Sequence, residues 1–465
     1  MASMQDFRGQ VKGQLFQHSV IRRLLSGPTI TACCRTAGHR WRRSFWSPQR
    51  TVITFLLQVL DGTKTLRSAV AVLLTHLAAT GRQALPSADP TAYCQARRRL
   101  PTTVVRALLA KVNTHLHETV RQAQATFLGH RVWVVDGSNC SMPDTPELQK
   151  AFPQPPGQKS GCGFPVAQFV AVFCWATGAA LDVAIDTIVP HELTLFRRLW
   201  HHFNTGDVVL ADRAYGSYVD LARLLEKGVY GVFRLHQRRK TDFRRGRRLG
   251  PDDRLQTWPR PDRWLKSMGI SPEAFDQLPE TLTVRVIRIR HVPKGFRSRT
   301  VYVATTLTDP VAYPAGQIAA LYRDRWTVEL NLRAMKTSLG MEVLRGQSYD
   351  VVVKEIAMHL LAYNLIRVIM WQAARRHGRD LHRLSFAGTL HRLREVLPIL
   401  IFHTSGQRSS FATLIDRLLK WIAEDIVPDR PNRYEPRRRK RRPKQYSLLQ
   451  EPRHYYRLQG AANAS

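Results

Sequence analysis

Four polar residues that could act together in chemistry share one face of a predicted helix. Tyr322, Arg325, Glu329 and Lys336 follow the spacing Y-x2-R-x3-E-x6-K in the segment LYRDRWTVELNLRAMKTSLG. At about 100° per residue, they project at roughly 0°, −60°, −20° and −40° around a helix. A carboxylate beside two cations and a phenol suits a site where a metal ion and a phosphate meet. The ordinary alternative is a solvated charged face, so residues elsewhere must decide between the two.

Two further carboxylates stand where apolar runs end. Asp136 follows the β-branched run in RVWVVDGS, and Asp212 follows the apolar run in DVVLADRAYGS. In phosphoryl transfer at a DNA backbone, both the entering and the leaving oxygen must be stabilised. Two divalent ions about 3.5–4 Å apart can stabilise both oxygens. With Glu329, the two Asp residues form a candidate Asp-Asp-Glu site for Mg²⁺. Taken singly, each Asp also has a plainer role, because Asp before Gly often forms a turn and Asp212 can pair with Arg213.

The elements that must position these acids predict an α/β layered domain. The runs VWVV, VAQFVAVFCWAT and AALDVAIDTIV predict three strands in a meander, with the first strand ending at Asp136. The segments DVVLA and YGVFRLH predict two more strands, and ELTLFRRLWHHF and YVDLARLLEKG predict helices. Glu329 comes much later, on a helix preceded by Pro314. The site therefore depends on three distant acids converging.

A basic block interrupts this pattern. Residues 238–299 are rich in Arg, Gly and Pro, and LTVRVIRIRHV within them predicts a strand with one cationic face. We interpret the block as a β-rich insertion. Further on, IAMHLLAYNLIRVIMWQAA is apolar nearly all round, which predicts a buried helix. Six regions are predicted. They are a helical DNA-binding region (1–128), the first part of a catalytic core (129–237), the insertion (238–299), the second part of the core (300–376), a helical region (377–427) and a flexible basic tail (428–465).

The charge of the chain predicts a polyanionic partner. The 465 residues include 71 Lys and Arg against 35 acidic residues, a formal charge of +36 whose self-repulsion opposes folding. Nucleic acid is the leading partner, although a ribosomal or chromatin-packing protein satisfies charge alone equally well. The triplet Arg97-Arg98-Arg99 is either a solvated helix end or a phosphate contact. No apolar stretch is long enough to span a bilayer, so we expect no membrane association.

The cysteines and histidines do not predict a second metal site. The six cysteines show no C-x-x-C pair, which is typical of reduced thiols in a cytosolic protein, and we find no secretory signal. His201 and His202 are adjacent in a predicted helix. Because an i, i+1 pair does not share a helix face, we interpret them as surface or DNA-facing residues.

Together the motifs carry a resemblance to a known family. VVDGS, VVLADRAYGSY and Y-x2-R-x3-E-x6-K resemble the three signature regions of bacterial insertion-sequence transposases of the DDE type, in the subgroup named for its Tyr-Arg-Glu-Lys motif. The resemblance extends in texture over about residues 40–435, including FWSPQRT, HELTLF and AYNLIR. It implies a ribonuclease-H-like core interrupted by a β-rich insertion between the second Asp and the Glu. The first motif reads DGS where DGT is usual, and Ser keeps the hydroxyl.

This resemblance implies an enzyme and its cofactor. We expect a DNA transposase that cleaves at terminal inverted repeats and transfers the freed ends into target DNA by cut and paste. The expected catalytic acids, which also ligate two Mg²⁺ ions replaceable by Mn²⁺, are Asp136, Asp212 and Glu329. The expected DNA contacts near the cut are Tyr322, Arg325 and Lys336.

The insertion of this family can also hold an aromatic side chain that stacks on a flipped base. Trp258 and Trp264 are the candidates in this chain. No motif anchors either residue, and large aromatics bury readily. We therefore expect core tryptophans and place neither in the site.

The remaining expectations concern assembly and location. Synapsis of two element ends implies a homodimer on DNA, bound to inverted repeats and target DNA in the bacterial cytoplasm, in association with the nucleoid. Two alternatives stay open: a catalytically silent DNA-binding protein derived from a transposase, and a nuclease on the same core without strand transfer.

Overall fold

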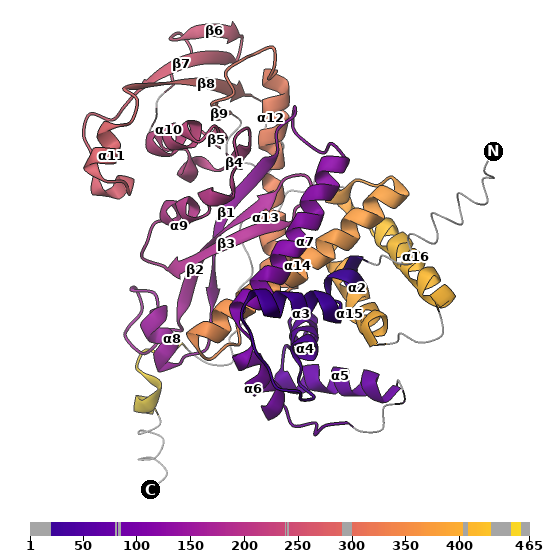
Figure 1. The fold of residues 1–465 in the computed structure, drawn as a ribbon. Helices are drawn as coiled ribbons and strands as arrows, with labels where there is room; N and C mark the ends of the chain where they lie inside the picture. The colour runs from indigo at the N-terminus through magenta and orange to yellow at the C-terminus, as the bar shows by residue number, and fades with distance from the viewer. Residues whose placement is uncertain are drawn as a thin grey trace, which may run out of the picture. The chain divides into compact units, whose positions relative to one another are not determined.

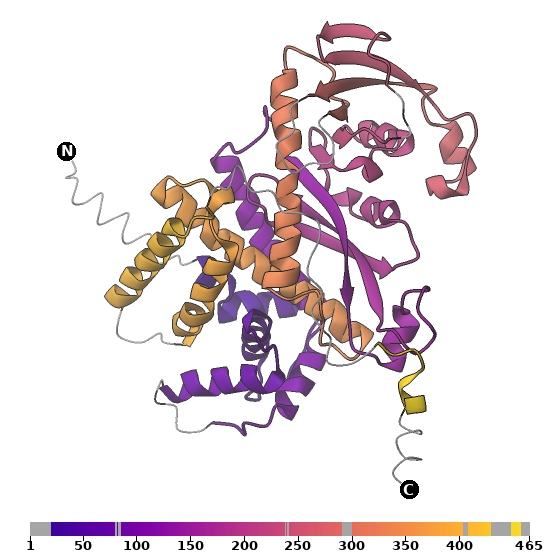
Figure 2. The ribbon, with the colours of Figure 1, turned by 180° about the vertical axis from the view of Figure 1, so that it is seen from behind.

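The chain forms two compact units, each built from two separate stretches of sequence. The computed structural model describes residues 20–79, 81, 85–237, 239, 241–290, 300–402, 408–428 and 448–456 (Figures 1 and 2). The first unit comprises Met1–Gln122 and Leu332–Pro428, and the second comprises Ala123–Asn331 and Asp429–Ser465. Most of the predicted basic tail lies outside the described residues. The predicted region boundaries stay predictions.

The first unit is helical throughout its described residues. Two of its helices begin at serine caps: the Ser26 and Ser47 side chains accept hydrogen bonds from backbone N–H groups of α3 and α4, and a Pro stands in the first turn of both. The helices are α2 (Val20–Leu24), α3 (Gly27–Thr36), α4 (Pro48–Leu60), α5 (Leu66–Ala79), α6 (Thr91–Arg99), α7 (Thr102–Gln122), a π-helical turn (Ala334–Ser338), α14 (Tyr349–His377), a 3₁₀ turn (Leu381–Arg383), α15 (Phe386–Phe402) and α16 (Arg408–Glu424).

Helix α14 forms the core of this unit. Side chains on all its faces are buried, including Met358, Leu361 and Met370 at 0% exposure. It packs against α4, α7, α15 and α16. The prediction of a buried helix from its apolar sequence is confirmed, because a helix without a polar face needs neighbours on every side.

A lysine within this core closes the end of a neighbouring helix. Lys354 on α14 is fully buried, and its Nζ donates to the carbonyl oxygens of Arg97 at 3.1 Å and Arg98 at 3.0 Å, at the C-terminus of α6. Asp350 pairs with the same Nζ at 3.0 Å. The last carbonyls of a helix have no partner within it and attract a cation. Lys354 therefore acts as a C-terminal cap supplied by another helix.

The arginine triplet of α6 consequently divides in two. Arg97 is buried, donates to Gln58 Oε1 at 3.2 Å and lies over the Phe55 ring. Arg98 and Arg99 are exposed. The interpretation of the whole triplet as a solvated helix end is therefore wrong for Arg97, because the turn of α6 places that residue against α4.

The second unit is built on one mixed sheet. Its strand order is β3-β2-β1-β4-β5-β9-β8-β7-β6, and β1 pairs antiparallel with β2 and parallel with β4. The predicted meander of three strands is confirmed by β1, β2 and β3. The strands are β1 (Val132–Ser141), β2 (Val166–Cys174), β3 (Ala180–Thr187), β4 (Val208–Ala211), β5 (Tyr230–Arg234), β6 (Arg247–Gly250), β7 (Asp253–Pro259), β8 (Thr281–Ile289) and β9 (Val301–Thr305).

Helices cover both faces of this sheet (Figures 1 and 2). Helix α9 connects β3 to β4 and α10 connects β4 to β5; these parallel crossovers move the same way across the sheet and place both helices on one face. Helix α12 contacts β5 and β8 from the other face. The helices are α8 (Pro146–Ala151), α9 (Glu192–Arg198), α10 (Tyr218–Glu226), α11 (Pro272–Asp276), α12 (Ala315–Asp324) and α13 (Trp326–Arg333), with 3₁₀ turns at Trp200–His202, Arg213–Tyr215 and Lys266–Met268.

The architecture is therefore a mixed α/β, ribonuclease-H-like core with a β-rich insertion. The insertion lies between β5 and β9 in sequence and adds β6, β7 and β8 to the edge of the same sheet. The predicted cationic face of β8 is wrong for Arg285, which is fully buried and pairs with Asp253. Carbonyl oxygens of the segment after β9, including that of Tyr313 at 2.6 Å, accept from its guanidinium. The charge is buried because both faces of β8 are covered.

No helix among the described residues is long and apolar enough to cross a membrane. The six cysteines are all free thiols.

Candidate active site

Two of the three predicted acids occupy matching positions on adjacent strands. The parallel pairing of β1 with β4 ends at Val135 opposite Ala211, and Asp136 and Asp212 are the next residues on the two strands. Adjacent strands lie about 4.7–4.9 Å apart, and residues in register point to the same side. The sheet thus places the two carboxylates side by side at the point where the parallel pairing of β1 with β4 ends.

The first strand is longer than predicted. It continues past Asp136 to Ser141, and Asp136 pairs with Ala171 of β2. The prediction of a strand end at Asp136 came from the Gly-Ser that follows, but β2 keeps that stretch extended by hydrogen bonding. Only the parallel partner β4 ends at this point.

Glu329 joins this site from helix α13. Arg325 lies one turn earlier, at the start of that helix, and its Nη2 donates to Glu329 Oε1 at 3.0 Å. The Arg325 side chain is 13% exposed and that of Glu329 is 39% exposed. Burial lowers the pKa of Arg325, but Tyr322, Glu329 and Asp212 outweigh it, and the net effect is a raised pKa. Arg325 is therefore a permanent cation between two of the predicted ligands.

Tyr322 lies beside the same guanidinium. It is 9% exposed and hydrogen bonds to Arg325, and burial raises the pKa of its phenol to about 12, with Asp212 adding to the rise and Arg325 opposing it. The phenol is neutral near pH 7. It serves as a hydrogen-bonding group here and not as a base.

The predicted stripe does not extend unchanged to Lys336. Helix α12 ends at Asp324, and Lys336 lies in the π-helical turn Ala334–Ser338, which belongs to the first unit. A π-turn has i→i+5 hydrogen bonds and a different rotation per residue. The π-turn changes the rotation per residue around Lys336, and the placement of this side chain beside the acids stays a prediction.

The pKa of Asp136 shows how closely the acids are grouped. The net effect is a pKa of about 6: burial is the main cause of the rise and Glu192 and Glu329 add to it, while the Gly137 N–H at 2.9 Å and Arg325 oppose it. The structure thus couples Asp136 with Glu329 directly and links Asp212 to Glu329 through Arg325. A carboxylate with a raised pKa among other carboxylates is a group whose charge a cation would stabilise.

A fourth carboxylate, which the sequence reading missed, lies in this cluster. Glu192 is the first residue of α9, and its Oε2 accepts a hydrogen bond from Tyr215 Oη at 3.1 Å. A Cβ on Gly137 would lie 2.6 Å from Glu192 Cδ, so a larger residue after Asp136 would push this carboxylate out of its position. Acidic residues are common in the first turn of a helix, so the sequence pattern alone does not mark Glu192 as a site residue. The available signal was Gly directly after the strand acid.

The donor set fits a hard divalent cation. Asp136, Asp212 and Glu329 offer carboxylate oxygens, which Mg²⁺ prefers, and Glu192 adds another acid beside Asp136. Like charges this close are costly unless a cation compensates them. The residues present therefore match the requirement of an acidic metal site.

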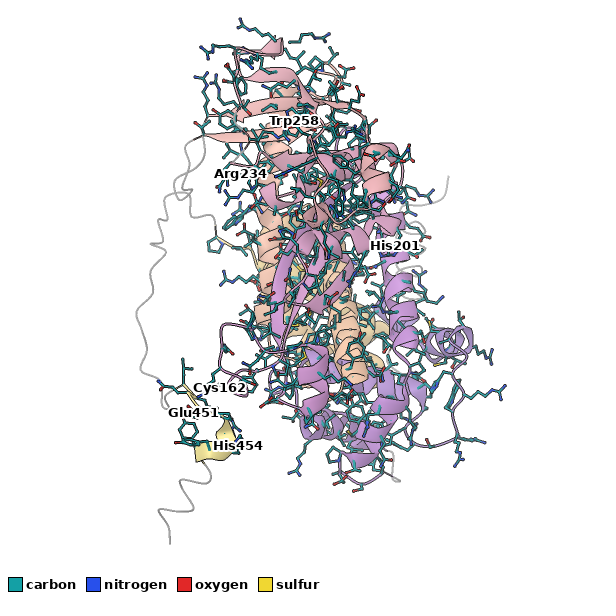
Figure 3. All side chains as sticks on the ribbon, turned by 90° about the vertical axis from the view of Figure 1, so that its left-hand side faces the viewer. Cys162, His201, Arg234, Trp258, Glu451 and His454 are labelled. Carbon is teal, nitrogen blue, oxygen red and sulfur yellow. The ribbon has the colours of Figure 1, made fainter. Side chains whose placement is uncertain are left out.

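A second group of metal-binding side chains lies apart from these acids. Asp182, His201 and His202 each offer a ligand atom, and these atoms lie within 4.8 Å of one another (His201 is labelled in Figure 3). His202 Nε2 is 3.0 Å from Asp182 Oδ2, and the two imidazole centroids are 3.9 Å apart. The prediction that the adjacent histidines point apart is wrong, because side-chain contacts bring the two rings together: His202 Nε2 lies against Asp182, and His201 Nδ1 lies 2.8 Å from the Arg198 carbonyl oxygen. Nitrogen donors suit Zn²⁺ better than Mg²⁺.

The two tryptophans of the insertion have structural roles. Trp258 is 4% exposed, with the Arg239 guanidinium 3.9 Å from its ring centroid (Figure 3). Trp264 donates from Nε1 to the carbonyl of Ile270 at 2.8 Å. The expectation of a core tryptophan is confirmed for Trp258, whereas Trp264 is only half-buried.

Comparison with known proteins decides the family. Residues 128–365, which contain all three predicted acids, match the family described as transposase DDE domain. The chain belongs to the DDE transposase family. It is 25% identical over 368 residues to the transposase InsG for insertion sequence element IS4 of Escherichia coli (strain K12), covering 78% of each chain. A solved structure of the piggyBac transposase synaptic complex with hairpin DNA aligns with 88% of this chain and 84% of its own at 10% identity, with a TM-score of 0.40.

Family membership confirms the main functional prediction. This DDE transposase is an enzyme of DNA cleavage and strand transfer, and DNA is its partner. DDE transposases use a divalent metal ion, in agreement with the acidic cluster. Membership in the Tyr-Arg-Glu-Lys subgroup and the roles of the individual site residues stay predictions.

Proposed function

We propose that this transposase moves an insertion sequence by cut and paste, cleaving DNA at terminal inverted repeats and joining the freed ends to target DNA. The observation that carries the proposal is the placement of Asp136 and Asp212 side by side where the parallel pairing of β1 with β4 ends, with Glu329 coupled to Asp136 and linked to Asp212 through Arg325. Acids from three distant parts of the sequence meet in one cluster. A simple structural ion pair does not require that arrangement.

In this proposal Asp136, Asp212 and Glu329 hold two Mg²⁺ ions, with Mn²⁺ as a substitute. When bound, the ions would activate a water molecule and stabilise the entering and leaving oxygens of the phosphate. The protein holds its carboxylates in place beforehand: the Gly137 N–H fixes Asp136, and Arg325 fixes Glu329. No serine or tyrosine nucleophile is needed.

The cations of the motif are proposed to hold the phosphate. Arg325 has five N–H donors and uses one on Glu329, so it keeps donors for a phosphate oxygen. Tyr322 helps position the DNA end through its hydroxyl, and Lys336 supplies a further phosphate contact. Residues 1–128 are proposed as the main DNA-binding region outside the core.

Glu192 is proposed as a supporting acid of the same site. Tyr215 and Gly137 hold it beside Asp136. In this position it either completes a metal's oxygen ligands or orients a water bound next to them. Its contribution is measurable in the cleavage assay described below.

Assembly follows from the reaction. Two element ends must be brought together, so we propose a homodimer on DNA, acting on the nucleoid in the bacterial cytoplasm.

The test is cleavage and strand transfer with purified protein and DNA that carries the element's own ends. We expect Glu329→Gln to abolish Mg²⁺-dependent cleavage while end binding in EDTA stays near wild type, because the substitution removes a ligand charge and keeps the shape. Glu192→Gln should lower the cleavage rate about 10- to 100-fold, as loss of a supporting group at a metal site does. Exposed Glu226→Gln in α10 serves as the control.

The outcomes separate the alternatives. Cleavage retained by Glu329→Gln would refute the metal assignment. Wild-type protein that binds ends but never cleaves is the silent DNA-binding protein, and cleavage without joined products is the nuclease.

A further inference from the structure

The loop between α3 and α4 forms one wall of a cavity in the first unit. The cavity has a volume of about 630 Å³, within the range of small-ligand sites. The end of α6 forms the opposite wall. The lining residues are His39, Arg40, Trp41, Arg42, Ser44, Trp46, Pro48, Thr51, Ala96, Arg99 and Leu100.

One half of this loop is fixed by packing. Trp46 packs on Tyr93 with ring centroids 5.1 Å apart. Phe45 lies against Arg50, whose guanidinium carbon is 4.6 Å from the ring centroid and whose Nη1 donates to the Phe45 carbonyl at 2.8 Å. Ser47 then caps α4. The cavity wall is thus a built structure.

The other half presents an indole to solvent. Gly38, with a φ of +63°, turns the chain out of α3. Trp41 is 42% exposed and stacks on the His39 imidazole, with centroids 5.8 Å apart and planes at 26°. Burial, helped by Lys354, lowers the pKa of His39, so its ring is neutral near pH 7. The pair offers a flat, uncharged aromatic surface at the edge of a basic cavity.

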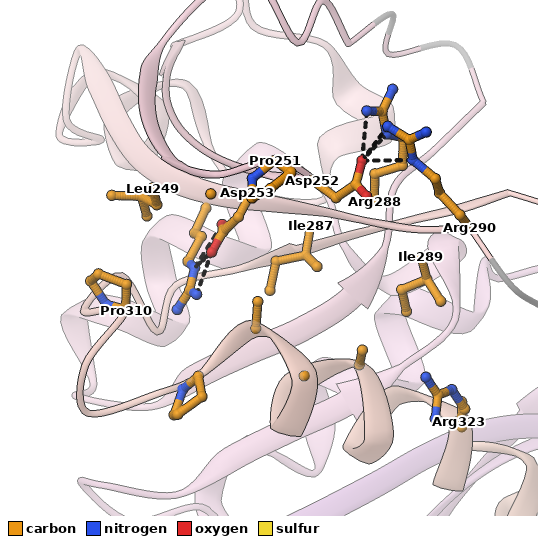
Figure 4. A pocket seen from close by; sticks show the side chains of 16 residues that line it. Leu249, Pro251, Asp252, Asp253, Ile287, Arg288, Ile289, Arg290, Pro310 and Arg323 are labelled. Carbon is orange, nitrogen blue, oxygen red and sulfur yellow. Dashed lines mark hydrogen bonds and ion pairs between the residues drawn. The ribbon is translucent and has the colours of Figure 1, made fainter.

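The positive charge of the arginines that line this cavity is not balanced by any acidic residue in the lining. Arg40, Arg42 and Arg99 line it, and no Asp or Glu does. Two other arginine-rich cavities among the described residues differ in this respect. One of them, with a volume of about 510 Å³, lies between the insertion and α12. There Arg288 and Arg290 both form ion pairs with Asp252 (Figure 4).

The other cavity, at the start of the insertion, contains the ion pair of Arg244 with Asp242. In both of these cavities the cations therefore have carboxylate partners of their own. The cavity beside Trp41 is the one of the three that lacks an acid, which favours an anionic ligand.

We propose that this cavity binds an unpaired stretch of DNA, with phosphates on Arg40, Arg42 and Arg99 and a base stacked on Trp41. Aromatic rings beside cations are the pattern by which proteins hold single strands, because every base has a face to stack while the backbone supplies charge. Paired bases inside a duplex have both faces covered by their neighbours, so a duplex offers the cavity only phosphates. The inference rests on the proposed function for its choice of DNA as the polyanion.

The test measures binding of full-length protein in EDTA to a labelled single strand and to the duplex of the same sequence. Trp41→Ala should weaken single-strand binding roughly tenfold and leave duplex binding nearly unchanged. Trp41→Phe should restore most of the loss. Arg99→Gln should reduce the slope of log affinity against log salt on the single strand by about 0.7, the value of one phosphate contact.

The controls are matched within the same unit. Trp421 on α16 has the same 42% exposure as Trp41, and Trp421→Ala should leave both affinities unchanged. Arg106→Gln, on the exposed side of α7, is the control for charge. Equal effects of Trp41→Ala and Trp421→Ala on the single strand would overturn the proposal. So would tighter binding of poly-glutamate than of single-stranded DNA, if Trp41→Ala weakens the poly-glutamate binding, since that would show an acidic peptide site.

The result is independent of the cleavage assay. If Trp41→Ala loses single-strand binding and Glu329→Gln retains cleavage, the proposal for this cavity stands and the proposed active site is rejected. The opposite pair of results would keep the active site and reject the cavity.

Discussion

At the scale of single residues, Asp136 carries a charge that its surroundings oppose. Its pKa is raised from 3.8 to about 6, chiefly by burial and then by Glu192 and Glu329. The folded protein therefore holds this proton more tightly than the unfolded chain does. The stabilising contribution is full below pH 3.8 and is lost as the pH rises through about 6. At pH 7 the ionised carboxylate destabilises the metal-free protein.

A substitution tests this directly. We expect Asp136→Asn to raise the melting temperature of the metal-free protein at pH 7 by about 2–4 °C, the effect of roughly 1 kcal/mol in a unit of this size. The gain should shrink toward pH 4, where Asp136 is protonated. Calorimetry in EDTA at both pH values measures it, with Asp262→Asn in an exposed turn as control. A lower melting temperature at pH 7 would show that the Asp136 charge is well compensated without a cation.

The residue types of the site were predictable from sequence, and their neighbours were not. Asp136, Asp212 and Glu329 were recognisable because each stands at a fixed place in a strand or helix pattern. Glu192 was not recognisable from sequence. Its place in the site depends on Gly137 and Tyr215, which are distant in sequence and contact it only in the folded protein. The same holds for Arg285, whose partner Asp253 lies on the neighbouring strand.

At the scale of elements, α6 depends on a cation from another helix. Lys354 supplies hydrogen-bond donors to the last carbonyls of α6. We expect Lys354→Met to destabilise the protein by about 1–3 kcal/mol, because the buried Arg97 carbonyl and the partly buried Arg98 carbonyl lose their donor. Urea unfolding followed by circular dichroism measures the change. Lys420→Met on α16, where the side chain is 65% exposed, is the matched control and should have little effect. Equal stability of the two variants would show that water replaces Lys354.

Strands and helices were predictable where the pattern is local. The strands β1–β3 were predictable from their β-branched and apolar runs, and helix α14 from a long stretch that is apolar nearly all round. The extension of β1 to Ser141 follows from pairing with β2, which no local pattern reveals. The π-helical turn Ala334–Ser338 likewise altered the predicted stripe. Pairing between distant segments decided the first difference, and the local i→i+5 hydrogen bonding of the π-turn decided the second.

At the scale of the whole molecule, charge governs DNA binding. The chain carries +36, and its C-terminal tail includes an unbroken basic run at residues 437–442, outside the described residues. We expect truncation after Pro428 to flatten the dependence of log affinity on log salt, by about 0.9 for each lost duplex phosphate contact. Fluorescence anisotropy over a range of salt concentrations measures the slope. Replacing residues 437–442 by Gln should reproduce most of the effect. An unchanged slope in both proteins would show that the tail does not touch DNA.

The division of the first unit into two stretches has a consequence for its synthesis. The apolar sides of α4 and α7 are covered by α14, which begins 227 residues after α7 ends. At about 5–20 residues per second, the ribosome needs roughly 10–50 s to supply that cover. During this interval the nascent N-terminal helices expose hydrophobic surface. A chain truncated before Tyr349 lacks α14, so this surface stays exposed. Chaperone capture and rapid degradation of such fragments are therefore expected in the cell.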